Sequence, residues 1–274
     1  MLRLTLVAWI AFLGGCSNNN TSRQSREPIV FTNSLGMRFI YVPPGEFLMG
    51  HPELRKPVIR VRLSGYWIAE TETTNSQYER INNGRKRLPE DATDQMPVTG
   101  VFKEEVLEFA KWLSAREDRS YNLPTDARWE YAARAGREQK DYPWGDYYPD
   151  RRENLGSGVL KEVKSYRPSP NGLYDMMGNV REYVLENYFE LTELSEPVGH
   201  VYVNPVWPST DVSSMCRGGY FGNLLGWVWL VMPASGNLVI NPERNRSLVG
   251  HVGFRLVLED NAELERYRAS NASQ

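Results

Sequence analysis

One stretch, Asn171-Gly-Leu-Tyr-Asp-Met-Met-Gly-Asn-Val-Arg-Glu-Tyr-Val184, constrains the fold of this chain more than any other. Turn-forming residues and two carboxylates lie in it between aromatic residues, so we expect a ligand-bearing loop and not a helix. Asp175 and Glu182 can each direct an oxygen at one point, and a turn at Gly178 would present backbone carbonyls beside them. Such all-oxygen ligation suits Ca²⁺. The spacing alone, however, favours a simpler alternative in which both carboxylates pair with Arg181 or cap backbone amides.

The N-terminal segment has the pattern of an export signal. Arg3 is followed by an apolar run over residues 4–13, which is too short to span a bilayer and has the layout of a secretory signal. The run ends in Leu13-Gly-Gly-Cys16, which looks like a bacterial lipobox, so we expect residues 1–15 to be removed and Cys16 to receive lipid. A plain cleaved signal with an incidental cysteine is the alternative. Residues 16–28 would form a flexible tether, and Ser17 would permit sorting to the outer membrane.

Length and composition predict one domain after this segment. The chain has 274 residues, of which 41% are hydrophobic, so it can bury a sizeable core. The net charge of -2 and the pI of about 6.0 provide no basic field, which argues against nucleic-acid binding. If Cys16 is lipidated, Cys216 has no disulfide partner, and it is expected to be a buried small hydrophobe, with a reactive thiol as the alternative.

Local patterns predict several strands and helices in the body of the chain. Alternating apolar residues predict strands on both sides of a turn at Pro43-Pro44-Gly45, and again over residues 58–68. A capping-box pattern at Thr74-Asn-Ser-Gln77 predicts a short helix from Asn75. Two longer helices are expected, over residues 103–117 and from Thr125 to residue 135, and the polar tail over residues 259–274 is expected to fray.

Five ordered stretches resemble the formylglycine-generating enzyme family, also called the sulfatase-modifying factor domain. They are residues 33–50, Glu72-Thr-Thr-Asn-Ser-Gln-Tyr78, residues 123–136 with Tyr142-Pro-Trp-Gly145, the stretch over residues 171–184, and Arg217-Gly-Gly219 paired with Gly253-Phe-Arg255. The resemblance implies a single irregular α+β domain over residues 29–258, with a C-type-lectin-like fold and little regular secondary structure. One departure is Arg128, which stands where the family has an acidic capping-box residue.

The resemblance also implies a structural calcium ion. The family's ligands correspond to the side chains of Asp175 and Glu182 and to the backbone carbonyls of Gly178 and Val180, which reverses the preference drawn from spacing. A second calcium site of the family would begin at Asn154, but the chain after it is shortened and no acid clearly replaces the remaining ligand. We therefore expect one calcium ion that holds irregular backbone in place.

The catalytic chemistry of the family depends on residues that this chain lacks. Catalytic members bind copper(I) with two cysteines shortly after the Arg-Gly-Gly motif, because Cu(I) prefers soft thiolates. The corresponding stretch here, residues 220–233, contains no cysteine, so we expect neither copper nor the oxidase reaction. The three histidines, His51, His200 and His251, show no paired spacing and are expected to be surface or packing residues instead of an iron site.

The C-terminal third predicts a surface for a partner protein. Apolar residues crowd positions 224–232, and they form either a partner-binding patch or a local core. Amide and arginine side chains near them would form a polar rim. The candidate partner-binding residues are Tyr220, Phe221, Asn223, Trp227, Trp229, Asn237, Arg244 and Arg246, with Asn204 also in the rim.

These expectations combine into one functional prediction. The chain is predicted to be a lipid-anchored protein of a bacterial cell envelope, at the outer membrane, whose non-catalytic domain binds another envelope protein in a secretion, motility or surface-display context. The alternative is an exported metal-dependent oxidoreductase of the same fold, acting on a peptide or on a small thiol or phenolic substrate.

Overall fold

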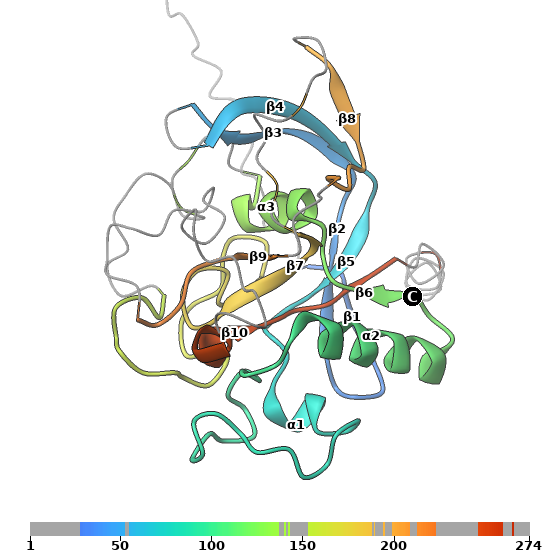
Figure 1. Cartoon of the computed structure of the whole chain (residues 1–274). Helices are drawn as coiled ribbons and strands as arrows, with labels where there is room; N and C mark the ends of the chain where they lie inside the picture. The colour runs from blue at the N-terminus through green and yellow to red at the C-terminus, as the bar shows by residue number, and fades with distance from the viewer. Residues whose placement is uncertain are drawn as a thin grey trace, which may run out of the picture.

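The computed structural model describes residues 28–52, 55–136, 140, 142, 153–187, 189, 194, 199–208, 213–222, 246–259 and 265. These residues form three small sheets, three α-helices and long irregular connections (Figure 1). The α+β class predicted from the sequence is confirmed. No helix within the described ranges combines the length and the apolar character needed to cross a membrane.

The largest sheet joins the two ends of the described domain. Its strands follow the order β1 (Val30–Thr32), β2 (Arg38–Val42), β5 (Tyr66–Ala69), β11 (Val257–Leu258) and β6 (Tyr121–Asn122), and all neighbours are antiparallel. The first and last strands of the described chain therefore belong to one sheet.

The second sheet begins directly after the predicted turn at Pro43-Pro44-Gly45, so the strands predicted on the two sides of this turn are present but lie in different sheets. β3 (Gly45–His51) pairs antiparallel with β4 (Arg55–Leu63), and β8 (Val201–Val203) joins the other edge of β4 in parallel. Val61 and Leu63 are buried in β4 while Arg60 and Arg62 lie on its outer face, which is the period of two expected for a half-buried strand.

The third sheet carries the residues that matter most for function. β7 (Arg181–Asn187) lies between β10 (Val252–Gly253), with which it is parallel, and β9 (Ser214–Arg217), with which it is antiparallel. The loop expected over residues 171–184 thus ends at Val180, and Glu182 belongs to a strand. The strand forms because Val252 and Arg217 supply neighbours on both edges, which a local pattern does not show.

The predicted helices are present, and the two with a predicted cap begin at that residue. In α1 (Asn75–Tyr78) the Thr74 hydroxyl and the Gln77 amide form the expected capping box. α2 spans Lys103–Glu117, and α3 spans Asp126–Arg134. The Thr125 hydroxyl accepts a hydrogen bond from the backbone N–H of Arg128 at 3.2 Å, so the helix begins normally without the family's acid.

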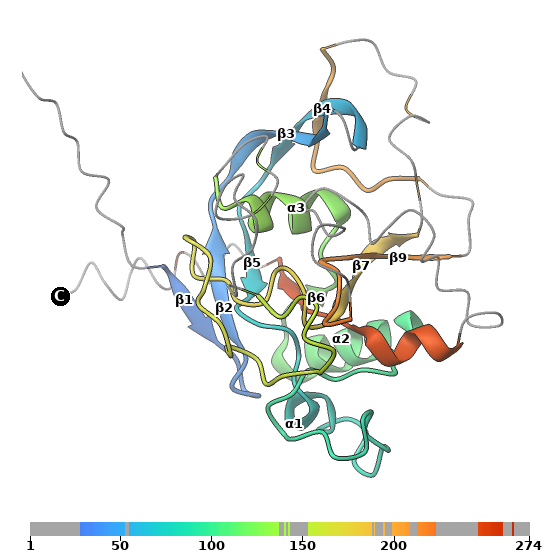
Figure 2. The ribbon, with the colours of Figure 1, turned by 90° about the vertical axis from the view of Figure 1, so that its left-hand side faces the viewer.

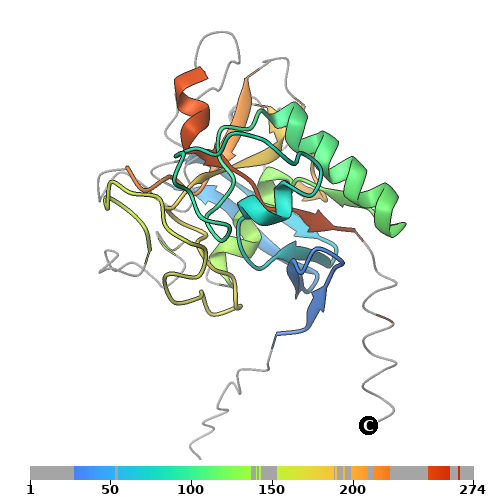
Figure 3. The same cartoon turned by 90° about the horizontal axis from the view of Figure 1, so that it is seen from below.

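The helices divide the interior into two hydrophobic clusters. α3 lies between the β3–β4–β8 sheet and the β10–β7–β9 sheet and buries Trp129 in one cluster (Figures 1 and 2). α2 lies beside β11 and β6 and buries Phe109 in the other, as the view from below shows (Figure 3). The segment over residues 153–180 contains no helix or strand and packs against the end of the third sheet, where Asn154 forms an isolated bridge with Gly178.

Candidate functional site

The alternating side chains of β7 separate two groups of buried ionisable residues. Tyr183 lies opposite Cys216 and packs in the cluster that contains α2, whereas Val184 packs in the cluster that contains α3. Arg181 and Glu182, which precede them, therefore point to opposite faces of the strand. The face of Glu182 holds the predicted metal ligands, and the face of Arg181 holds part of the predicted partner-binding surface.

The first group, here called the acid cluster, consists of Glu72, Glu153, Asp175 and Glu182. All four are at most 7% exposed. Burial, followed by the charges of Asp175 and Glu182, raises the pKa of Glu72 well above its usual range. Burial and the Asp175 charge do the same to the pKa of Glu153. The cluster therefore holds more negative charge than its surroundings neutralise.

Arg255 supplies the buried positive charge of the acid cluster. Its Nε and Nη2 donate to the two oxygens of Glu182, both at 2.7 Å, and Trp129 donates to Oε2 of the same carboxylate at 2.8 Å. Arg255 also donates to the carbonyls of Ala69 and Tyr174 at 3.1 and 2.9 Å. One side chain thus ties β7 to β5 and to the irregular segment, and Glu182 pairs with Arg255 instead of Arg181.

Asp175 has fewer partners than Glu182. It adopts φ 55°, and its Oδ2 accepts a hydrogen bond from the backbone N–H of Lys164 at 2.9 Å. Burial raises the pKa of this carboxyl to about 6, although the Lys164 N–H and Arg255 act in the opposite direction. The side chain is therefore available to a cation that would compensate its charge.

The residues of this loop fit a calcium ion. Oε2 of Glu153 is buried and has no hydrogen-bond partner, and it lies near Asp175, whose charge acts on it. Such an orphaned acceptor beside a second carboxylate is a position that a hard cation would satisfy. Among the described residues, no three His, Cys, Asp or Glu side chains converge on one point. The predicted calcium site does not require such a group, because its ligands are two side chains and two backbone carbonyls.

Two members of the acid cluster, Glu72 and Glu153, were not predicted from the sequence. Glu72 accepts hydrogen bonds from the backbone N–H of Val180 at 3.1 Å and from the Asn179 amide at 2.8 Å, and it thereby fixes the turn before β7. Its position at the start of the Glu72-Thr-Thr-Asn motif is the only local signal. Glu153 directly precedes Asn154, where the family's other calcium site begins, and adjacency to that position was the available clue.

The second group, here called the arginine–aromatic cluster, consists of Arg181, Tyr220, Phe221 and His251. The Arg181 guanidinium carbon lies 3.9 Å from the centre of the Tyr220 ring. Tyr220 stacks on His251 with ring centres 4.8 Å apart, and Phe221 meets His251 edge-on at 5.3 Å. The three rings are half-buried and Gly222 is exposed, so the cluster reaches the surface directly after the Arg-Gly-Gly motif.

Cys216 lies beneath this cluster and is a buried free thiol. It is 2% exposed, and burial raises its pKa to about 12. The positive charges of Arg181 and Lys103 lower the pKa only in part. The thiol is therefore protonated at neutral pH, which agrees with the expectation of a buried small hydrophobe.

The described histidines do not form a metal site. His51 ends β3, His200 packs against Tyr202 with ring centres 4.6 Å apart, and His251 belongs to the arginine–aromatic cluster. Since no group of three potential metal-binding side chains occurs in the described part of the chain, the three-histidine iron site is not formed there.

The predicted partner-binding residues are described only in part. Tyr220 and Phe221 come together as expected, and Arg246 begins a 3₁₀ helix, Arg246–His251, that leads into β10. Cys16 and the other predicted residues lie outside the described residues, namely Asn223, Trp227, Trp229, Asn237 and Arg244. Asn204, predicted to be in the polar rim, instead bonds to Ser64: its Oδ1 accepts from the Ser64 N–H at 2.8 Å.

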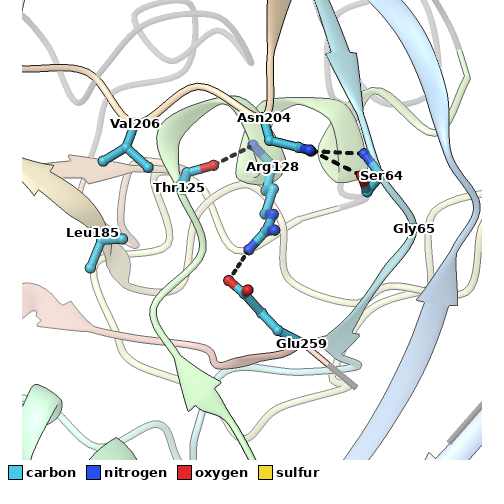
Figure 4. Close-up of a pocket in the computed structure, with 8 residues that line it drawn as sticks. All are labelled: Ser64, Gly65, Thr125, Arg128, Leu185, Asn204, Val206 and Glu259. Atoms are coloured by element: carbon cyan, nitrogen blue, oxygen red, sulfur yellow. Dashed lines mark hydrogen bonds and ion pairs between the residues drawn. The ribbon is translucent and has the colours of Figure 1, made fainter. Parts of the chain in front are cut away.

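A cavity of about 420 Å³ surrounds this Asn204–Ser64 contact (Figure 4). Arg128, which replaces the family's acid, extends through it and forms an ion pair with Glu259. This ion pair ties α3 to the residue that follows β11. Leu185 and the exposed Val206 add apolar lining. Because the charged and amide groups shown pair with each other, this cavity is a weaker candidate than the arginine–aromatic cluster.

Comparison with known proteins identifies relatives over most of the chain. A family model described as Sulfatase-modifying factor enzyme 1-like domain matches residues 28–260. Serine/threonine-protein kinase pkn1 of Chlamydia caviae is 28% identical over 213 residues, which cover 68% of this chain and 33% of that protein. The chain thus spans about a third of the length of this kinase.

Two further relatives bear on activity. Formylglycine-generating enzyme of Streptomyces coelicolor is 27% identical over 254 residues, covering 66% of this chain and 78% of that enzyme. Inactive C-alpha-formylglycine-generating enzyme 2 of Mus musculus is 33% identical over 108 residues, which cover 34% of this chain and 33% of that protein. Similarity alone therefore connects the chain to proteins named as active and to one named as inactive.

Solved structures agree with the fold. Treponema denticola variable protein 1 superposes with a TM-score of 0.69 at 18% identity, covering 85% of this chain and all of that one. PvdO of Pseudomonas aeruginosa gives a TM-score of 0.68 at 21% identity over 86% of this chain. At these identities the likeness establishes the fold, and the predicted C-type-lectin-like, formylglycine-generating-enzyme-like class is confirmed.

Proposed function

The chain belongs to the family of the sulfatase-modifying factor enzyme 1-like domain, and on that premise we propose that it is a non-catalytic, protein-binding member anchored to a bacterial envelope. The proposal has three parts: absence of the copper-dependent oxidase reaction, binding of another protein through the surface after the Arg-Gly-Gly motif, and attachment by lipid at Cys16. Each part has its own support and its own test.

The state of Cys216 is the observation that carries the proposal. A copper(I) site of the family's kind needs a pair of soft thiolates, and the chain has two cysteines, Cys16 and Cys216. Cys216 is buried in β9 under the arginine–aromatic cluster, and its raised pKa keeps it protonated. It precedes the Arg-Gly-Gly motif, while the stretch that follows the motif contains no cysteine.

Aromatic residues begin the stretch in which the family resemblance would place the catalytic thiols. Tyr220 and Phe221 follow the motif directly and are half-buried, so part of each side chain is accessible at the surface. Aromatic side chains beside arginine are enriched in the energetically important parts of protein interfaces. Together with the apolar and amide residues expected after them, they support a surface for an envelope protein partner.

Calcium is proposed as a structural ion that stabilises this surface from behind. Glu182, predicted as a ligand from the resemblance, is held by Arg255, so we propose that Asp175 and Glu153 would provide the carboxylate oxygens and that Gly178 and Val180 would provide the carbonyls. A bound divalent cation would add positive charge to a cluster in which one buried arginine faces four carboxyl groups. The role is structural, because the acid cluster lies on the opposite face of β7 from the aromatic surface.

Lipid attachment is supported by the N-terminal pattern, in which a short apolar run leads to Leu13-Gly-Gly-Cys16. The full chain should partition into the membrane fraction, and Cys16→Ala should move it to the soluble fraction. Mass spectrometry of the intact protein checks this part: an unmodified Cys16 in membrane-purified protein would refute it.

Recovery of a partner from envelope membranes tests the central claim. The full chain would be captured from crosslinked, detergent-solubilised membranes, and a partner protein should be lost with Tyr220→Ala and with the double variant Trp227→Ala, Trp229→Ala. Trp112→Ala, on the distant helix α2, is the matched control and should recover the same partner. Equal recovery by all folded variants would remove the aromatic surface from the interface.

Two further measurements separate this proposal from an oxidoreductase. The purified protein incubated with copper, O₂ and a cysteine-containing peptide should yield no aldehyde, because a second thiolate is missing. Metal analysis should find calcium without stoichiometric copper or iron. Aldehyde formation, or one bound copper or iron per chain, would overturn the non-catalytic assignment.

A further inference from the structure

Arg181 has hydrogen-bond donors that the described residues leave unused. Its side chain belongs to a residue that is only 5% exposed, yet Nε and Nη1 have no hydrogen-bond partner in the described part of the chain. Its side chain contacts Tyr220 in two ways: it forms a hydrogen bond with the Tyr220 side chain, and the Tyr220 ring lies over the guanidinium. A buried donor without an acceptor costs about 1–3 kcal/mol, and more when it is charged, so this arrangement needs a reason.

No negative charge within the described residues compensates Arg181. Its neighbour Glu182 points to the other face of β7 and pairs with Arg255. The Cys216 thiol beside it is protonated, and burial, with the charge of Arg181, lowers the pKa of His251 and favours the neutral imidazole. The cluster therefore holds one fixed positive charge.

His251 adds a second unused polar atom to the same place. Its Nδ1 is buried and has no hydrogen-bond partner among the described residues, and its ring stacks on Tyr220, which in turn covers Arg181. A neutral imidazole can donate or accept at this nitrogen according to its tautomer. Unsatisfied polar atoms of Arg181 and His251 thus flank one aromatic ring near the surface.

We propose that the arginine–aromatic cluster is a binding subsite for a carboxylate group of the partner polypeptide. One formal positive charge matches a monoanion, whereas a phosphate dianion would leave a negative charge unbalanced among aromatic rings. One of the unused N–H groups of Arg181 would donate to a carboxylate oxygen, in a site that aromatic rings partly cover. The inference rests on the proposed binding function and names the chemical group that is recognised.

Acetate is the probe that tests the subsite without the partner. Thermal unfolding of the full chain would be followed at pH 7.5 in sodium acetate and in sodium chloride of equal ionic strength. Acetate should raise the Tm saturably by about 3 °C over chloride. Sulfate and phosphate stabilise proteins without a specific site, so the anions are compared by the part of the Tm rise that depends on Arg181. This part should be smaller for sulfate and phosphate than for acetate, and a larger Arg181-dependent rise with either would overturn the carboxylate assignment.

Substitution of Arg181 assigns the effect to this site. Arg181→Met should abolish the difference between acetate and chloride, and Arg181→Lys, which keeps the charge but not the planar donor group, should retain part of it. Arg80→Met, at an exposed position on the surface, is the matched control and should respond like the native protein. An acetate effect of equal size in Arg181→Met refutes the proposal. If that variant is unfolded by circular dichroism, an unchanged effect in Arg181→Lys refutes it.

Capture from envelope membranes separates the subsite from the wider function. Arg181→Met should recover at least tenfold less partner than Arg80→Met. If Tyr220→Ala loses the partner while Arg181→Met keeps it, the carboxylate subsite is wrong and the binding function stands. If no variant affects recovery but acetate still stabilises only proteins with Arg181, the cluster binds a carboxylate that does not belong to the partner, and both the partner subsite and the proposed interface are wrong.

Discussion

Replacement of Arg255 by methionine tests the acid cluster most directly. The guanidinium is fully buried and donates to Glu182 twice, and to the carbonyls of Ala69 and Tyr174. Removing one partner of a buried ion pair costs about 3–5 kcal/mol, and each carbonyl left without its donor costs about 1 kcal/mol more. The expected loss is therefore about 5–7 kcal/mol, against a total stability of about 5–15 kcal/mol for a domain of this kind.

Chemical denaturation followed by tryptophan fluorescence measures this loss. Arg255→Met should be unfolded or close to its midpoint without denaturant. The double variant Arg255→Met, Glu182→Gln should recover about 2–3 kcal/mol, because it no longer buries an unpaired carboxylate. A loss below about 2 kcal/mol in the single variant would show that Arg255 does not hold the cluster, and a double variant no more stable than the single would show that charge is not the cause.

The other predictions concern the metal, a titrating carboxylate and a close backbone contact. After dialysis against EDTA, 1 mM Ca²⁺ should raise the Tm by about 5 °C and Mg²⁺ much less, with most of the rise lost in Asp175→Ala; an unchanged Tm in the native protein would exclude the ion. Burial and the charge of a neighbouring aspartate raise the pKa of Glu186 from 4.5 to about 7, so the folded protein binds this proton more tightly than the unfolded chain does. The protonated carboxyl stabilises the fold fully below pH 4.5, and about 3 kcal/mol of this stabilisation is lost as the pH rises through 7. In Glu186→Gln, the fall in the free energy of unfolding over this pH range, measured by urea denaturation, should be smaller by about 3 kcal/mol. Gly253→Ala would place a Cβ 2.6 Å from the Val98 carbonyl and should cost about 1–3 kcal/mol, while Gly250→Ala, with open space around it, should change stability by less than about 0.5 kcal/mol.

Local features of the fold were accessible from the sequence. The caps of α1 and α3 depend on bonds between residues three positions apart, so Thr74 and Thr125 signalled them without tertiary information. The fold class followed from the ordered motifs, and the family model confirms that resemblance over residues 28–260. α3 forms although Arg128 replaces the family's capping acid, because a side-chain cap contributes only about 1 kcal/mol.

The candidate sites were accessible only in part, because their partners are distant in sequence. Arg255 reaches Glu182 across 73 positions, and Glu72 reaches the turn before β7 across 107 and 108 positions. No spacing rule predicts such pairs, since they depend on how β5, β7 and the irregular segment are placed. The sequence therefore offered Arg181 as a partner for Glu182, although adjacent residues of a strand point to opposite faces.

The same alternation explains how one strand serves structure on one face and recognition on the other. Arg255 and Arg181 are both buried and both lie near β7, but Arg255 has every nitrogen hydrogen-bonded whereas Arg181 has two without partners. Folding alone accounts for Arg255, because the acids around it would be costly to bury without it. Folding alone does not account for Arg181, since a methionine would fill the same space without an unsatisfied charge. Unsatisfied polar groups that persist in a packed interior concentrate at functional sites, and this contrast is the physical reason to seek a ligand at Arg181 and an ion at Asp175.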